Sequence, residues 1–239
     1  MNLYKSLSTI YHEMYQSLFD YEQEFDFYTA TLQRFSSKEI IEYGCGTGNL
    51  AKLFLDSGYR YLGVDLNQEM LDIAKKNLPQ DNFVLGDLKT FEADKKFDCA
   101  LITGRTISYL TRNEEVLASY RNIARNLKDQ GVLIFDAIDA SALFGNFDES
   151  QKETTINNYK RISTSKKNLK TGWTWDWSSE YFEKKEGVFQ SLGKDHSVVR
   201  AFTKDEIKLF LDMSGFELLE VINKETYMWK DHYFVAKKK

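Results

Sequence analysis

Hydrophobic positions follow two different periods along the chain, and their alternation predicts the fold class. Near the N-terminus, Phe25, Tyr28, Leu32 and Phe35 recur at steps of three and four, so they line one face of a helix. From residue 39, short apolar runs alternate with helical stretches, beginning with EIIEYG, NLAKLFLDSG and YRYLGVDL. This spacing implies right-handed crossovers and a mainly parallel sheet with helices on both faces. We therefore predict an α/β fold.

Residues 150–200 interrupt this rhythm. Polar and apolar positions alternate in NNYKRIST, TGWTWDWSSEYF and GVFQSLG, a pattern typical of antiparallel strands. Afterwards the chain resumes with a helix in KDEIKLFLDMSGF and two strands in FELLEVIN and HYFVAKK. We predict one domain built from residues 1–149 and 201–239, with an antiparallel insertion of about three strands over 150–200.

Composition narrows the function classes. The chain has 239 residues and a net charge of −4, which argues against a general affinity for nucleic acid or anionic lipid. No apolar run approaches the roughly 20 residues of a membrane helix, and the N-terminus lacks a secretory signal. Two cysteines, Cys45 and Cys99, are too few for a disulfide framework. We predict a cytoplasmic protein without a membrane partner.

The chemistry is concentrated in Glu42-Tyr43-Gly44-Cys45-Gly46-Thr47-Gly48, between the first strand and the following helix. Glycines there let the backbone turn sharply and approach a ligand, at the edge where open α/β sheets bind nucleotides. The dinucleotide fingerprint would place its third glycine at position 49, which is Asn49. Asp65 ends the second strand, where a carboxylate can accept both ribose hydroxyls. Asp87 follows the third strand, where an acid can accept from an adenine amine.

These three ordered elements resemble the class I S-adenosylmethionine-dependent methyltransferase family, in particular its small-molecule group. The resemblance implies a seven-stranded, Rossmann-like sheet with an antiparallel seventh strand, an N-terminal helical lid over residues 1–36, and an insertion at 150–200 that caps the acceptor side. It also implies S-adenosylmethionine as cofactor and S-adenosylhomocysteine as product. The predicted cofactor-binding residues are Glu42, Gly44, Cys45, Gly46, Gly48, Asp65, Leu66, Asp87, Leu88 and Thr103.

The sequence gives weaker signals for the residues that bind or activate the methyl acceptor. A general base is needed only if the acceptor arrives protonated, and the predicted catalytic candidates are His196, Tyr11 and Asp136. The predicted substrate-binding residues are Arg105, Tyr109, Trp175 and Arg200. We predict no metal site, since Asp136 and Asp139 lack further identifiable oxygen ligands. Trp173, Trp175 and Trp177 share a face that could roof the pocket, form a dimer interface or cover the sheet.

The main hypothesis is transfer of a methyl group to nitrogen or oxygen of a small molecule, by a protein that could form a homodimer through the insertion. One alternative is an RNA or protein methyltransferase. Its hint is the basic run containing Lys160, Arg161, Lys166, Lys167 and Lys170, which otherwise is a solvated hairpin. Another is a protein that binds S-adenosylmethionine without catalysis.

Overall fold

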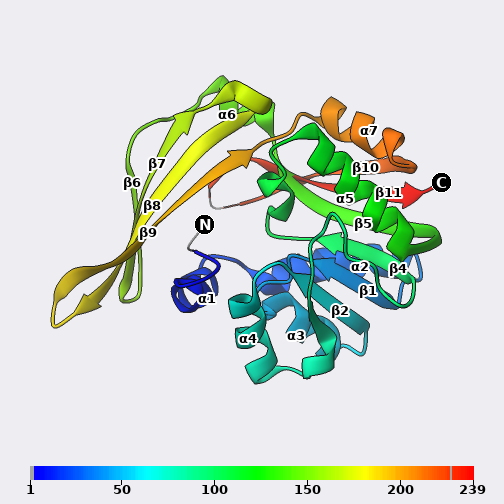
Figure 1. Cartoon of the computed structure of the whole chain (residues 1–239), viewed down its shortest axis with the longest axis horizontal. Coiled ribbons are helices and arrows are strands. Elements are labelled where there is room, and N and C mark those ends of the chain that lie inside the picture. The colour runs from blue at the N-terminus through cyan, green and yellow to red at the C-terminus, as the bar shows by residue number, and fades with distance from the viewer. Residues whose placement is uncertain (1–2, 227) are drawn as a thin grey trace.

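The chain forms a large sheet covered by helices and a smaller sheet that projects from one side (Figure 1). A computed structural model describes residues 3–226 and 228–239. The strands of the large sheet are β1 (Glu39–Tyr43), β2 (Arg60–Asp65), β3 (Phe83–Leu85), β4 (Phe97–Ile102), β5 (Leu127–Ile138), β10 (Phe216–Lys224) and β11 (Asp231–Lys238). Their order is β10-β11-β5-β4-β1-β2-β3.

The large sheet is parallel except for β11. Strands β1 to β5 pair in parallel, whereas β11 runs antiparallel to both β5 and β10. The predicted Rossmann-like sheet with its antiparallel seventh strand is thereby confirmed. In this topology, the carboxyl ends of β1 to β5 meet at one edge, and Lys224, the last residue of β10, lies at the same edge.

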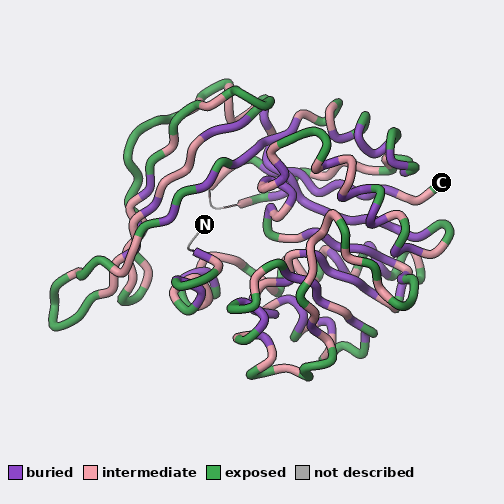
Figure 2. Tube along the Cα trace, viewed as in Figure 1, coloured by how far each residue is buried: buried purple, intermediate pink, exposed green. Residues whose placement is uncertain are grey.

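Helices bury both faces of this sheet. On one face, α2 (Tyr21–Arg34), α3 (Asn49–Asp56) and α4 (Gln68–Asn77) pack around Tyr28, Phe54 and Leu71. On the other face, α5 (Asn113–Asn126) and α7 (Lys204–Met213) pack around Tyr120 and Phe210. Figure 2 shows the large sheet as the most continuously buried part of the molecule. The remaining helical segments are α1 (Ser8–Tyr15), α6 (Ala140–Gly145) and the short turns η1 (Gln80–Asn82), η2 (Thr106–Tyr109) and η3 (Leu169–Thr171).

The insertion forms a separate antiparallel sheet of four strands, not about three. These are β6 (Lys152–Ile156), β7 (Tyr159–Lys167), β8 (Thr174–Lys185) and β9 (Val188–Arg200), paired in chain order. The sequence pattern missed β6 because KETTI is a largely exposed edge strand that offers little alternation. A bridge between Asp139 and Phe202 joins this region to the end of β5.

The N-terminal helix α1 lies between the two sheets (Figure 1). Leu7 and Tyr15 pack with Tyr181 of β8, and the backbone N–H of Leu3 donates to Asp195 of β9 at 3.1 Å. The helix therefore contacts the small sheet while it borders the carboxyl edge of the large one. Within the described residues, we find no helix that combines the length and the apolar character needed to cross a membrane.

Candidate active site

The turn after β1 is held in a conformation that requires glycine. Gly44 has φ +77°, and its N–H donates to the carbonyl of Val64 at 2.7 Å. A Cβ at Gly44 would lie 2.4 Å from Oγ1 of Thr106, which is closer than Cβ atoms approach other atoms in real proteins. The turn therefore packs directly against the segment that follows β4. Gly48 serves packing instead, because a Cβ there would meet Leu78 and Ala74 at 3.0–3.1 Å.

Three acids stand at the ends of successive strands. Glu42 is 1% exposed and accepts hydrogen bonds from the hydroxyls of Tyr61 and Thr103. Burial raises its pKa to about 7, although these hydrogen bonds oppose the shift. Asp65 accepts the N–H of Gly46 at 2.9 Å and that of Asn67 at 2.8 Å, so it fixes the glycine turn.

Asp87 differs from these two buried acids. It is more exposed, and its Oδ1 accepts the N–H of Lys89 at 2.8 Å. A carboxylate can accept about four hydrogen bonds, so each of the three acids keeps capacity for a ligand.

One cavity runs along this edge of the sheet. It begins at Asp87 and Leu88 after β3, passes Asp65 and the glycine turn, and reaches Thr103 and Gly104 after β4. It continues to Glu24 of α2 and Lys224 of β10. The cavity thus has a long section over β1 to β3 and a second section beyond β4.

The N-terminal segment closes the second section with aromatic rings. The Tyr4 ring stands perpendicular to that of Tyr109, with centroids 5.7 Å apart and hydroxyl oxygens separated by 2.7 Å. Tyr11 packs against Tyr4 with centroids 5.2 Å apart. All three line the cavity. Burial, and for Tyr4 also the neighbouring phenols, raises the pKa of Tyr4 and of Tyr109, so both hydroxyls stay protonated at neutral pH.

A histidine on α1 holds this segment to the glycine turn. Nδ1 of His12 lies 2.9 Å from Oγ1 of Thr47, and Gln16 bridges from Nε2 of His12 to Asn49. The contact joins the N-terminal helix to the loop that contains Gly46 and Gly48, and the role of this helix as a lid stays a prediction.

The predicted donor-side residues lie together, with one exception. Of the ten cofactor-binding candidates, all but Gly48 line the cavity: Glu42, Gly44, Cys45, Gly46, Asp65, Leu66, Asp87, Leu88 and Thr103. Their individual contacts with a ligand stay predictions.

The predicted acceptor-side residues are more scattered. Tyr11 and Tyr109 line the cavity, but Asp136 lies beneath the loop after β4, where it accepts the Arg105 N–H at 3.0 Å and the Lys224 ammonium at 2.8 Å. The Arg105 side chain is turned toward Asp231, with Nε 2.5 Å from Oδ2, and stacks over Trp229.

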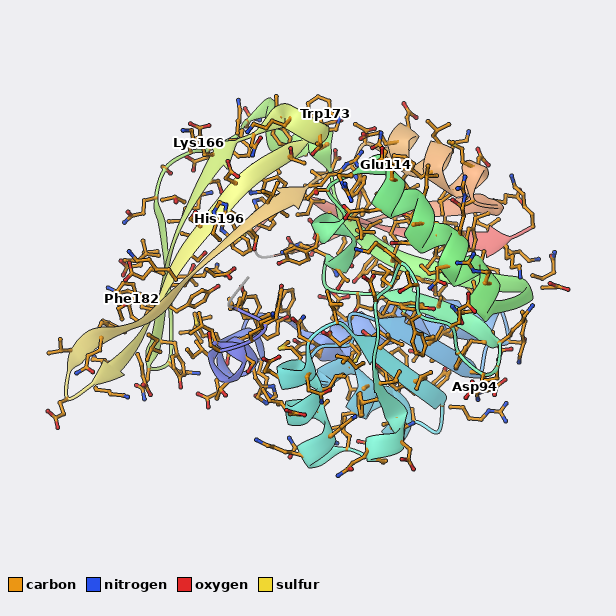
Figure 3. The ribbon with its side chains drawn as sticks, in the orientation of Figure 1. Asp94, Glu114, Lys166, Trp173, Phe182 and His196 are labelled. Atoms are coloured by element: carbon orange, nitrogen blue, oxygen red, sulfur yellow. The ribbon has the colours of Figure 1, made fainter. Side chains whose placement is uncertain are left out.

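The insertion places its predicted residues away from the cavity. His196 (Figure 3) is on the outer face of the small sheet, with its side chain 59% exposed and Nδ1 3.0 Å from Oγ of Ser178. Arg200 is buried against Glu206 of α7, and Trp175 packs on Trp229. Alternation along β9 showed that His196 and Arg200 share a side, but it carried no information on which side faces inward. Asp195 and Ser197 are the buried neighbours.

Sequence reasoning missed four residues of this site: Tyr4, His12, Glu24 and Lys224. Each is isolated from any motif, since Tyr4 and His12 belong to an N-terminal segment without strong periodicity and Lys224 ends an edge strand. The only available signal was the polar side of α2, which includes Glu24.

The chain is thus a Rossmann-like α/β protein with a cavity at the carboxyl ends of its parallel strands, where such folds bind nucleotides. Residues 40–131 match the model of the family described as "Methyltransferase domain". The predicted resemblance to class I S-adenosylmethionine-dependent methyltransferases is thus confirmed for this segment and for the fold.

The individual proteins that this chain resembles also carry methyltransferase names. An S-adenosylmethionine-dependent methyltransferase from Clostridium acetobutylicum superposes with a TM-score of 0.83 at 18% identity, over 99% of both chains. The putative methyltransferase YqeM of Bacillus subtilis is 27% identical over 138 residues, 56% of this chain and 55% of that one. A dTDP-3-amino-3,4,6-trideoxy-alpha-D-glucopyranose N,N-dimethyltransferase of Streptomyces venezuelae is 27% identical over 100 residues, 42% of each chain. The chain therefore covers about half the length of the curated relatives.

Proposed function

We propose that this protein transfers a methyl group from S-adenosylmethionine to the nitrogen of a small-molecule amine. One observation carries the proposal: the glycine turn with its strand-end acids and the Tyr4–Tyr11–Tyr109 cluster line a single cavity. The matched domain and the amino-sugar methyltransferase among the relatives support it.

The donor section suits S-adenosylmethionine in shape and charge. Asp65 and Asp87 both line this section, and we assign the ribose hydroxyls to Asp65 and the adenine amine to Asp87. Leu66 lines the same section with 65% of its surface exposed, a large apolar side chain that a flat ring would cover. Glu42 supplies a buried carboxylate for the ammonium group of the methionine part. When bound, the sulfonium supplies an already activated methyl group.

The acceptor section suits a cationic amine. Three tyrosine rings line this section. Aromatic rings attract an ammonium or methylammonium group, with an expected gain of about 0.5–2 kcal/mol. Because the Tyr4 and Tyr109 hydroxyls stay protonated, they donate and accept hydrogen bonds but do not act as phenolate bases. This section orients the acceptor and excludes water. An acceptor that arrives as an ammonium ion must also lose a proton before its nitrogen can take the methyl group.

Turnover of amines tests the proposal directly. We expect label from methyl-labelled donor to pass to primary amines such as amino sugars, and not to phenols or carboxylates of similar size. Transfer to phenols alone would contradict the amine acceptor, while the absence of any transfer with intact donor binding would favour the non-catalytic alternative.

Donor binding is expected to depend on pH through Glu42. Its raised pKa of about 7 means that the carboxyl is neutral below pH 7 and becomes a carboxylate above it. S-adenosylhomocysteine, which keeps the ammonium group, should therefore bind roughly tenfold more tightly at pH 8 than at pH 6. Calorimetry at both pH values measures this, and Glu42→Gln should remove the dependence. An equally steep dependence in Glu42→Gln would assign it to another group.

The RNA alternative loses its main support. In the basic run, Arg161 is fully buried between the rings of Tyr15 and Trp177, and Lys160 lies over Phe182 and Phe189. The buried Arg161 is therefore unavailable to phosphates, whereas Lys166, Lys167 and Lys170 are exposed. Retention on RNA that weakens steeply with salt would restore the alternative.

Two finer expectations complete the proposal. Cys45 and Cys99 are both buried and form no disulfide, which supports a cytoplasmic location. A homodimer through the small sheet stays a prediction, and sedimentation analysis of the intact chain tests it.

A further inference from the structure

The far end of the cavity contains a carboxylate that the donor does not account for. Among the described residues, four carboxylates line the cavity: Glu24, Glu42, Asp65 and Asp87. The last three stand at the ends of β1, β2 and β3. Glu24 instead comes from α2 and pairs with Lys224 at the end of β10, and it lines the same cavity as the tyrosine cluster.

Glu24 is fixed in place by a buried lysine. Its Oε1 lies 2.5 Å from Nζ of Lys224, which is 4% exposed and also pairs with Asp136 at 2.8 Å. The Tyr233 hydroxyl donates to Glu24 as well. Lys224 carries one positive charge against two carboxylates, so this group of three side chains holds a net negative charge at the cavity wall. An ammonium group would neutralise it.

Glu24 also faces a second cavity. That cavity is lined by Leu18, Phe19, Asp20, Gln23, Glu24, Lys224, Glu225 and Thr226. Phe19, Glu24 and Lys224 therefore form a shared wall between the transfer cavity and this polar one. A proton accepted on one side of Glu24 can leave on the other without crossing the donor section.

We propose that Glu24 is a catalytic residue that binds the ammonium form of the acceptor and takes its proton, an inference that rests on the amine function proposed above. The proton passes from the ammonium nitrogen to a carboxylate oxygen of Glu24. The freed lone pair then forms the N–CH3 bond as the C–S bond breaks, and the electron pair of that bond stays on sulfur. The products are a methylammonium ion and a neutral thioether, and Glu24 returns its proton to water through the second cavity.

The local electrostatics agree with this role. Burial raises the pKa of Glu24 from its usual value, and Asp136 adds to the shift, while Lys224 and Tyr233 oppose it. Tyr21 and Tyr28, on the same helix, are the other titratable groups that face it. A carboxylate with a raised pKa is a better proton acceptor than one in water.

Amine binding to the protein saturated with S-adenosylhomocysteine tests the role of Glu24 separately from the proposed amine function. The probes are three amines, each paired with its alcohol: glucosamine with glucose, cyclohexylamine with cyclohexanol, and benzylamine with benzyl alcohol. We expect wild type to bind at least one amine more tightly than its alcohol. Glu24→Gln should weaken that amine at least tenfold, with alcohol and S-adenosylhomocysteine binding unchanged. For any amine that is turned over, kcat should fall roughly 10²–10⁴-fold in Glu24→Gln.

Glu24→Gln is expected to keep the fold intact. Glutamine retains an oxygen for Lys224, which keeps Asp136 as its charged partner. Glu22→Gln, an exposed position on the same helix, is the matched control and should behave as wild type. An amine preference that survives Glu24→Gln would overturn the role of Glu24 and leave the amine function standing. No amine preference in wild type would overturn both.

Discussion

Asp65→Ala is expected to remove the stabilisation that S-adenosylhomocysteine gives to the folded protein. The wild-type carboxylate accepts the Gly46 N–H on Oδ2, and on Oδ1 it accepts the Asn67 N–H and, at 3.3 Å, the Asn67 side-chain amide. Once the ribose displaces that long side-chain bond, each oxygen can accept one ribose hydroxyl. Loss of two hydrogen bonds to a charged group costs about 3–6 kcal/mol, or roughly 10²–10⁴-fold in affinity. Thermal unfolding with and without S-adenosylhomocysteine measures this, since a ligand that binds only the folded state raises the midpoint.

NAD is the control ligand for this measurement, and Asp94→Ala is the control variant. Asp94→Ala, at an exposed position remote from the cavity (Figure 3), should keep the full ligand-induced rise. NAD should raise the midpoint of neither protein. A rise with NAD alone, or an undiminished rise with S-adenosylhomocysteine in Asp65→Ala, would contradict our interpretation of the residue 44–48 turn.

Lys224→Met is expected to destabilise the protein by about 3–5 kcal/mol, because it leaves one fully buried and one partly buried carboxylate without their cation. Asp136 is fully buried, and Glu24 faces it across the lysine ammonium. Burial alone would lower the pKa of Lys224, but the two carboxylates raise it overall, so the lysine is charged in the folded protein. Urea unfolding gives the free energy.

The same substitution should also loosen the loop after β4. Gly104 and Arg105 both have positive φ, +62° and +63°, and the Arg105 N–H is held by Asp136. Amide exchange across residues 103–109 should therefore accelerate in Lys224→Met. Lys208→Met, at an exposed position on α7, serves as the control. A loss below 1 kcal/mol with unchanged exchange would show that Lys224 does not support this loop.

The donor side of the site was predictable because its signals are local. Three short motifs at the ends of consecutive strands are sufficient, since parallel strands with right-handed crossovers must bring those ends to one edge. Gly48 is the one predicted donor-side residue that does not line the cavity, because a glycine at positive φ can serve helix packing as well as a ligand, and sequence does not distinguish the two.

The acceptor side was not predictable to the same degree because its residues come from distant segments. Alternation placed His196 and Arg200 on one side of β9, but the direction of that side depends on how the small sheet docks. Tyr4, Glu24 and Lys224 meet only after α2 packs on the large sheet and the N-terminal segment folds over the edge.

The sequence by itself determined the sheet, its helices and the donor section, because hydrophobic period and glycine spacing act within short stretches of chain. Only the tertiary structure decided which groups face the acceptor. In the folded chain, Lys224 is buried between Glu24 and Asp136, and the His196 side chain faces solvent. The Tyr4 ring packs perpendicular to that of Tyr109. These arrangements depend on contacts between residues up to 200 positions apart in the chain, such as that of Glu24 with Lys224, which no local pattern records.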